Sequence, residues 1–175
     1  MRKVILYSAV SLDGFIARTN GDIDWLFQGE EGQDYGYADF IQTIDTVIMG
    51  GTTFRQILTF EGDFPYADKR CYVVTRDVAL KHEYAEFIHH DIIDHVNTWK
   101  NEIVGKNIWL VGGSEINTIL LEHQLIDELQ LFIHPVFLTK GIRLFNEINL
   151  DQWFTLSDIE EFSNGMVRLV YHFKK

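Results

Sequence analysis

The chain has 175 residues, of which 46% are hydrophobic and only two are proline, so it is globular and can bury a sizeable core. Its formal net charge of -11 argues against a binding surface for nucleic acids or anionic membranes. The charge does not exclude a phosphorylated small ligand, because salt screens exposed charges beyond roughly 8 Å, but such a ligand needs a local cationic pocket.

Cys71 is the only cysteine, which rules out an internal disulfide and points to a reducing compartment. It lies in an apolar run and is predicted to be a buried small hydrophobe instead of a catalytic thiol. The apolar run near the N-terminus is too short for a signal peptide, and no apolar run approaches the ~20 residues that span a membrane. We therefore expect a soluble cytoplasmic protein.

Strands and helices alternate through the first half of the chain. In chain order, the predicted elements are a strand at Val4–Val10, a long loop at Ser11–Gln33, a helix at Tyr35–Ile44, a strand at Thr46–Met49, a helix at Thr52–Leu58 capped by Thr52 or Thr53, a strand at Arg70–Thr75 and a short strand at Glu86–His89. This alternation is typical of an α/β domain with a parallel sheet.

The same pattern continues and then changes near the C-terminus. The next predicted elements are a helix at Ile92–Asn101, a strand at Ile108–Val111, a helix at Ser114–His123 and a strand at Glu128–Pro135. Two further strands, Phe154–Glu161 and Met166–Phe173, flank the turn signal Ser163-Asn164-Gly165 and predict an antiparallel hairpin. Residues 1–175 are therefore expected to form one domain with a mainly parallel sheet and an antiparallel C-terminal end.

The stretch from Trp109 to Ile116 carries the most specific local signal. A buried strand ends in Gly112-Gly113, and a helix with Ser114 as its predicted cap follows at once. Glycines let a backbone approach a ligand closely, and a helix N-terminus favours a phosphate. Taken alone, the glycine pair is equally compatible with a simple tight turn.

Three other connections share the expected position of this glycine pair. The loop at Ser11, the turn at Gly50-Gly51 and the turn at Thr75-Arg76 each follow a predicted parallel strand. Ligands of open α/β sheets bind beyond the carboxyl ends of the strands, where these connections meet. The sequence therefore predicts a ligand site built from all four.

The order of these motifs resembles the dihydrofolate reductase superfamily, and more closely the reductase domain of the bifunctional riboflavin-biosynthesis deaminase/reductase and its stand-alone bacterial relatives. The resemblance covers nearly the whole chain. The motifs that carry it are Ala9-Val10-Ser11-Leu12-Asp13-Gly14-Phe15-Ile16-Ala17, Asp45-Thr46-Val47-Ile48-Met49-Gly50 with Thr53, Val73-Val74-Thr75-Arg76, Val111-Gly112-Gly113, and Asp127-Glu128-Leu129 with His134-Pro135. It implies a three-layer α/β/α fold around an eight-stranded sheet, an NADPH cofactor and a homodimer.

The resemblance also implies a role for each cofactor-site residue. The backbone near Ala9 and the side chain of Ile16 are expected against the nicotinamide. Phosphate oxygens are expected at Gly50, Thr52 and Thr53, and the adenosine end at Thr75 and Arg76. The pyrophosphate and the nicotinamide side are expected at Gly112, Gly113, Ser114, Glu115 and Ile116.

Two departures from the family pattern bear on function. The family commonly has Arg or Lys directly after Gly50, but this chain has Gly51, so NADH becomes possible beside NADPH unless Arg55 or Arg76 compensates. Folate reductases place an acid on the helix before the second strand, which matches Asp34 here, with Asp39 as the alternative. His134 stands where a supporting threonine is common, so Asp34, Asp39 and His134 are the candidate catalytic residues.

The histidines near residue 90 do not predict a metal site. His89 and His90 are adjacent and point to opposite sides in a strand, and the sequence has no pair of histidines four residues apart on one helix. A nucleophile elbow of the form G-x-S-x-G is also missing, which weakens a hydrolase interpretation.

The sequence therefore favours an NAD(P)H-dependent oxidoreductase that transfers a hydride to a small heterocyclic substrate, resembling 5-amino-6-(5-phosphoribosylamino)uracil reductase. Two alternatives stay open: a dihydrofolate or pteridine reductase, and a non-catalytic nucleotide-binding protein of the same fold. A homodimer is expected because the last strand has apolar residues such as Leu169 and Tyr171 on one face and Val170 on the other. A helix or loop of the same chain is the other candidate to cover that face.

Overall fold

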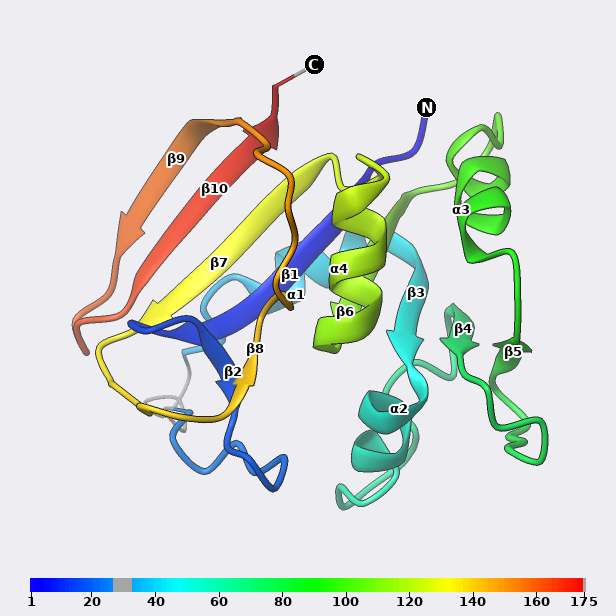
Figure 1. Cartoon of the computed structure of the whole chain (residues 1–175), viewed down its shortest axis with the longest axis horizontal. Helices are drawn as coiled ribbons and strands as arrows, with labels where there is room; N and C mark the ends of the chain where they lie inside the picture. Colours follow the sequence, from blue (N-terminus) through cyan, green and yellow to red (C-terminus); the bar gives the residue numbers. More distant parts are fainter. Residues whose placement is uncertain (27–32, 175) are drawn as a thin grey trace.

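The computed structural model describes residues 1–26 and 33–174, and its centre is an eight-stranded sheet (Figure 1). The strands are β1 (Val4–Ser11), β3 (Ile44–Gly50), β4 (Arg70–Val74), β5 (Glu86–Ile88), β6 (Asn107–Gly112), β7 (Glu128–His134), β9 (Phe154–Glu161) and β10 (Val167–Phe173). They run in the order β5-β4-β3-β6-β1-β7-β10-β9. All neighbours pair in parallel except β10, which is antiparallel to both β7 and β9. The predicted parallel sheet with an antiparallel C-terminal hairpin is confirmed.

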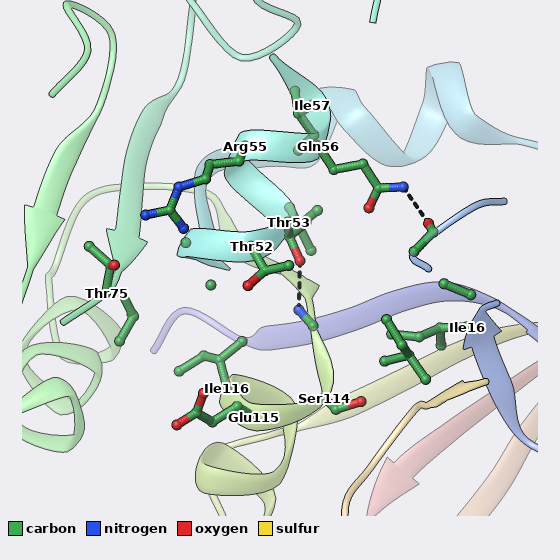
Figure 2. A pocket seen from close by; sticks show the side chains of 18 of the residues that line it. Ile16, Thr52, Thr53, Arg55, Gln56, Ile57, Thr75, Ser114, Glu115 and Ile116 are labelled. Carbon is green, nitrogen blue, oxygen red and sulfur yellow. Dashed lines mark hydrogen bonds between the residues drawn. The ribbon is translucent and has the colours of Figure 1, made fainter. Parts of the chain in front are cut away.

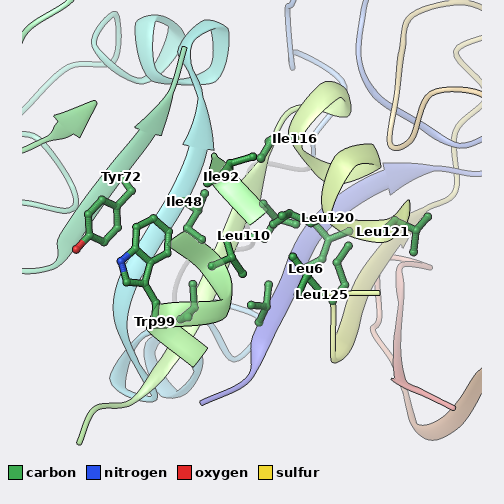
Figure 3. Packing of buried hydrophobic residues seen from close by; sticks show 14 of the residues in the cluster. Leu6, Ile48, Tyr72, Ile92, Trp99, Leu110, Ile116, Leu120, Leu121 and Leu125 are labelled. Atoms are coloured by element: carbon green, nitrogen blue, oxygen red, sulfur yellow. The ribbon is translucent and has the colours of Figure 1, made fainter. Parts of the chain in front are cut away.

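Helices cover both faces of this sheet, which gives the three layers that were expected. The helices are α1 (Tyr37–Gln42), α2 (Gly51–Ile57), α3 (Ile92–Lys100) and α4 (Ser114–Glu122). On one face, Leu6, Ile48 and Leu110 pack against apolar residues of α3 and α4 (Figure 3). On the other face, Val47 and Trp109 pack against α1 and α2. Burying both faces of the central strands explains why they read as continuous apolar runs.

Three boundaries differ from the predicted ones. The helix predicted at 35–44 is shorter, because Ile44 is the first residue of β3 and is buried in the core. The predicted loop 11–33, of which 27–32 lie outside the described residues, contains the short strand β2 (Phe15–Ala17). Strand β2 pairs with β8 (Ile142–Arg143) in a separate two-stranded sheet. Strands of two and three residues are too short to show a period in the sequence.

The predicted helix caps were wrong. Helix α4 begins at Ser114 with Gly113 as its N-cap, and α2 begins at Gly51 with Gly50 as its N-cap, and neither cap makes a side-chain hydrogen bond. The hydroxyl of Ser114 donates to the backbone oxygen of Arg143 instead. A tertiary partner thus replaces the local capping bond that the sequence favoured.

The sheet surface formed by β7, β10 and β9 has a continuous apolar face. Directly paired residues share a face, so Leu131, Leu169 and Ile159 form one row across the three strands. On β9 this face is open to solvent, since Leu156 is 43% exposed and Ile159 is 53% exposed. In Figure 1, α4 lies over β1 and β6, beside these three strands.

Cys71 is buried, and burial raises the pKa of its thiol to about 12, so it is an inert core side chain as predicted. Among the helices that the structure describes, none is long and apolar enough to cross a membrane.

Candidate functional site

A cavity of about 910 Å³ opens where β1, β3, β4 and β6 end (Figure 2). The predicted cofactor residues that line it are Ala9, Ile16, Gly50, Thr52, Thr53, Thr75, Arg76, Gly113, Ser114, Glu115 and Ile116. They come from five separate parts of the chain, which the parallel sheet brings to one edge. All four connections that were predicted to share a ligand site reach the cavity. Ser11 itself is buried and does not line it, but Ile16 of the loop that follows does.

Gly112 is the one predicted cofactor residue outside the cavity wall. Its φ is 114°, a conformation that favours glycine, and a Cβ added there would lie 3.5 Å from the amide of Asn117. The peptide bond between Gly112 and Gly113 is cis. Gly112 therefore shapes the end of β6 from behind the wall.

Gly113 joins the two helices that flank the cavity. Its backbone N–H donates to the Thr53 Oγ1 atom at 3.1 Å, which fastens the start of α2 to the turn between β6 and α4 (Figure 2). A Cβ added at Gly113 would lie 3.2 Å from the same oxygen. The absence of a side chain at Gly113 thus permits this close junction.

Gly51 occupies the position where the family commonly has a cation. A Cβ added there would lie 2.8 Å from Thr75 Oγ1 and 3.0 Å from Thr75 Cβ, so a larger residue requires a shift of the β4 end. The guanidinium of Arg55 lies 3.5 Å from the same point. One helical turn later in the chain, Arg55 therefore supplies a positive charge beside the position that Gly51 leaves bare.

Both arginines that line the cavity are paired with carboxylates. Arg55 bonds Asp77 at 2.5 Å, and Arg76 bonds Glu115 at 2.7 Å across the gap between β4 and α4. The Arg76 side chain is 90% exposed, so this pair is weak and can open. The two cations at the β4 side of the cavity are thus available to a phosphorylated ligand only when their carboxylate partners give way.

Another part of the cavity is aromatic, and sequence reasoning missed it. Tyr7, Tyr37, Tyr66 and Trp109 line it from β1, α1, the segment before β4, and β6. We call these four residues the aromatic end. Aromatic residues in or near strands are typical of a core, so no sequence signal separated them from the buried residues around them.

The three candidate catalytic residues lie outside the cavity lining. Asp34 is exposed and accepts backbone hydrogen bonds from Gly36 and Ala38, which lower the pKa of its carboxyl. Asp39 is an exposed residue of α1. His134 is buried at the end of β7, where its ring meets Trp25 edge-on at 5.2 Å and burial lowers its pKa. Their catalytic roles stay predictions.

The histidines near residue 90 each contact a neighbouring oxygen atom. His89 Nδ1 lies 2.8 Å from the backbone oxygen of Thr75, and His90 Nδ1 lies 2.9 Å from a carboxylate oxygen of Asp91. Within residues 1–26 and 33–174, no group of three or more His, Cys, Asp or Glu side chains has the geometry of a metal site. Both histidines line the cavity near Arg76 instead.

Comparison with known proteins extends over nearly the whole chain. The uncharacterized protein YwjB of Bacillus subtilis is 39% identical over 166 residues, covering 94% of this chain and 95% of that protein. The uncharacterized protein YyaP of the same organism is 35% identical over 183 aligned positions, covering 98% and 95%.

Solved structures share the fold. A putative riboflavin biosynthesis protein from Shewanella sp. PV-4 superposes with a TM-score of 0.86 at 26% identity and covers 99% of both chains. A diaminohydroxyphosphoribosylaminopyrimidine deaminase/5-amino-6-(5-phosphoribosylamino)uracil reductase from Thermotoga maritima gives a TM-score of 0.71 at 17% identity. It covers 99% of this chain and 57% of the Thermotoga chain, a likeness of fold alone.

A family model assigns the chain more directly. The model for the RibD C-terminal domain matches residues 2–168, which include every strand that lines the cavity and both helices beside the glycine turns. The relatives, the fold and this match agree with the motifs that were read from the sequence. The chain belongs to the RibD C-terminal domain family, within the dihydrofolate reductase superfamily.

Proposed function

We propose that this protein is an NADPH-dependent reductase acting on a small heterocyclic substrate. The observation that carries the proposal is the cavity, because eleven of the twelve residues expected to hold the cofactor line it together. Residues so far apart in sequence meet at one edge only if the parallel sheet positions them there. Membership of a reductase-like family supports the same activity.

The cavity residues fit a dinucleotide phosphate. Thr52 and Thr53 offer hydroxyl groups beside the glycine turns, and Arg55 and Arg76 can pair with phosphate oxygens. Ala9 and Ile16 form an apolar wall of the kind that a nicotinamide ring needs. When bound, reduced nicotinamide supplies a hydride, and water supplies the proton that completes the reduction.

The chain's own contribution is to position the reacting groups. The wall at Ala9 and Ile16 and the aromatic end line one cavity, in which we propose that the nicotinamide and the substrate ring are held together. Holding the two reacting carbons about 3–3.5 Å apart and excluding water accounts for much of the rate enhancement of such enzymes.

The proposed substrate class is a ribosylaminopyrimidine, as in the reductase activity named for the Thermotoga protein. In this reaction the hydride adds to C1′ of the ring-opened sugar and the proton goes to the attached nitrogen. The C=N bond becomes a C–N single bond, and the ribose becomes a ribityl chain. The single buried cysteine fits a reducing compartment, for which we propose the cytoplasm.

The two alternatives have less support than this reductase. A dihydrofolate reductase needs an acid beside its pterin, but the Asp34 carboxylate is occupied by backbone groups of α1 and does not line the cavity. A non-catalytic protein was suggested by the lost cation at Gly51, but Arg55 places a charge beside that position.

The test is a set of turnover and binding measurements. We expect NADPH oxidation to depend on 5-amino-6-ribosylaminouracil or its 5′-phosphate. Oxidation only with dihydrofolate selects the first alternative. Tight NADPH binding with no turnover of either class selects the non-catalytic alternative, and absence of NADPH binding rejects all three.

A further inference from the structure

We propose that Glu115 is a specificity-determining residue, whose carboxylate competes with the 2′-phosphate of NADPH for the guanidinium of Arg76. The inference rests on the proposed function and deepens it, because it identifies what limits the preference for NADPH over NADH. Three features of the described residues carry it: the bridge between Glu115 and Arg76, the firmer hold on the neighbouring carboxylate, and the charges that line this side of the cavity.

Glu115 and Arg76 form a bridge across the gap between β4 and α4. They meet at 2.7 Å although they lie 39 residues apart in the chain, and both line the cavity. In Figure 2, Glu115 lies on α4, on the other side of the cavity from Arg55 of α2. The side chains of Arg76 and Glu115 are 90% and 70% exposed, so the bridge is weak and its members can exchange partners.

Glu115 is held by fewer groups than the carboxylate beside Arg55. Asp77 bonds Arg55 through one carboxylate oxygen at 2.5 Å, and its other oxygen accepts from the backbone of Ala79 at 3.0 Å. Among residues 1–26 and 33–174, Arg76 is the one hydrogen-bond partner of the Glu115 carboxylate. Glu115 is therefore the carboxylate that gives way more easily when a phosphate approaches.

A 2′-phosphate has few cations to choose from in this cavity. Arg55 and Arg76 are the only lysine or arginine residues among the described residues that line it, and three carboxylates line it with them: Asp77, Asp91 and Glu115. A phosphate dianion offers Arg76 a stronger, bidentate partner than one carboxylate does, so it can open the bridge.

The bridge affects the two cofactors differently. NADPH gains the charge-assisted bond to Arg76 only after the bond to Glu115 is lost, so part of the gain is cancelled. NADH has a hydroxyl group in place of the 2′-phosphate, and this group neither needs Arg76 nor displaces Glu115. The carboxylate of Glu115 therefore lowers the affinity for NADPH and leaves the affinity for NADH nearly unaffected.

The deciding experiment measures the binding of NADPH and NADH to Glu115→Gln by calorimetry. The amide keeps the size of the side chain and removes its charge, so Arg76 is free to bond the phosphate. We expect NADPH to bind at least about threefold more tightly than to the wild type, which is within the range of one exposed ion pair, and NADH affinity to stay nearly unchanged.

Three results with Glu115→Gln overturn the inference. Unchanged NADPH affinity would show that the bridge has no cost. An equal gain for both cofactors would show that the carboxylate repels the pyrophosphate, which NADPH and NADH share. A loss of affinity for either cofactor would show that Glu115 itself holds the ligand.

Two further variants connect the gain to Arg76. In an Arg76→Ala background, Glu115→Gln is expected to give no gain, because no cation is then released. Glu122→Gln removes the same charge from the last residue of α4, outside the cavity lining, and is expected to change neither affinity. A gain that persists without Arg76, or that Glu122→Gln reproduces, contradicts the role of Glu115.

These results stay separate from the test of the proposed function. If NADPH binds to the wild type and Glu115→Gln changes nothing, the cofactor site stands and the inference fails. If Glu115→Gln selectively strengthens NADPH binding but no substrate is reduced, the inference stands and the reductase activity fails. A wild-type protein that binds neither cofactor overturns both.

Discussion

At the scale of single residues, the cavity wall around the turns at Gly50-Gly51 and Gly112-Gly113 depends on where neighbouring atoms leave no room for a side chain. Gly51 and Gly113 both have ordinary backbone angles, so their role comes from close approach of neighbours and not from conformational freedom. Gly51 faces Thr75 and Gly113 faces Thr53, and each contact brings one element to the cavity wall. Substitutions at these positions therefore act on the geometry of the site.

We predict that Gly113→Val weakens NADPH binding by at least tenfold, which is about 1.4 kcal/mol. The added side chain would press on Thr53 Oγ1, which lies 3.2 Å from the Cβ position, and would push apart the two helix starts that we propose to hold the phosphates. Calorimetry on the purified variant measures the affinity, and thermal unfolding checks that the variant is folded. A folded variant with unchanged affinity rejects the role of Gly113.

Arg55 and Arg76 are predicted to set the preference for NADPH over NADH. Each lines the cavity and can pair with a 2′-phosphate when its own carboxylate partner gives way. Arg55→Ala and Arg76→Ala should each lower NADPH affinity about tenfold and leave NADH affinity nearly unchanged. Arg18→Ala, which removes an exposed and paired arginine outside the cavity, is the control. Equal losses for both cofactors would mean that neither arginine reads the phosphate.

His134 is predicted to make stability depend on pH. Burial lowers its pKa below the ordinary 6.5, so between its folded and unfolded pKa values the unfolded chain binds more protons than the folded one. The free energy of unfolding should therefore fall as the pH drops below 6.5, and His134→Gln should flatten that fall. Denaturant unfolding at several pH values measures both proteins, and identical pH dependence would contradict the burial effect.

The two ends of the cavity differ in how far the sequence could reveal them. Glycines and threonines after strands form a recognisable order, so the resemblance named the residues around the glycine turns, and all of them except Gly112 line the cavity. Tyr7 and Trp109 carry no such signal, because a ring in a strand looks the same whether it faces a core or a cavity. The position of Arg55 beside Gly51 also depends on helix geometry, which spacing alone left open between Arg55 and Arg76.

At the scale of elements, the long strands and helices were predictable and their ends were not. Strand β7 and helix α4 bury clear apolar patterns, whereas β2 and β8 exist only because they pair with each other. The caps failed for the same reason. Ser114 and Thr53 were predicted to cap their own helices. In the structure the Ser114 hydroxyl donates to the backbone oxygen of Arg143, and the Thr53 hydroxyl accepts from the backbone of Gly113.

One distant contact ties three elements together and gives a prediction. The buried ammonium of Lys100, at the end of α3, bonds Asp127 at 2.6 Å, and the same carboxylate oxygen accepts from the backbone of Val4 in β1. Asp127→Asn leaves a buried positive charge without its counter-ion, so we expect a loss of about 3 kcal/mol in the free energy of unfolding.

Two comparisons make this measurement decisive. Asp68→Asn removes a carboxylate that is 72% exposed from its ion pair with Lys69, and it should cost less than about 1 kcal/mol. Adding Lys100→Met to Asp127→Asn should restore part of the lost stability, because the unpaired charge is then gone. Denaturant titration of the three variants checks both, and equal costs for Asp127→Asn and Asp68→Asn would show that burial of Lys100 does not matter.

At the scale of the whole molecule, the apolar face of β7, β10 and β9 supports the expected homodimer. Ile159 and Leu156 lie exposed on the edge strand, in rows that continue the buried surface of the sheet. Exposed apolar rows of this kind usually mark an interface. We therefore expect a mass of twice 20.4 kDa in light scattering at micromolar concentration.

A charge placed on this face should separate the subunits. Ile159→Asp is predicted to give a mass near 20.4 kDa, because a buried, unpaired carboxylate is costly in an apolar interface. Ile103→Asp is the matched control, since Ile103 is equally apolar and fully exposed but follows α3, far from β9 in the chain. A wild-type protein of 20.4 kDa, or a dimer that tolerates Ile159→Asp, contradicts the proposed interface.

Titration calorimetry with NADPH tests the central proposal most directly, since every functional inference depends on the cavity at the ends of β1, β3, β4 and β6 holding this cofactor. We predict saturable binding of one NADPH per chain, at least tenfold weaker in folded Gly113→Val and unaffected by Arg18→Ala. A folded wild-type protein that takes up no NADPH, or that binds it equally well after Gly113→Val, would contradict the account.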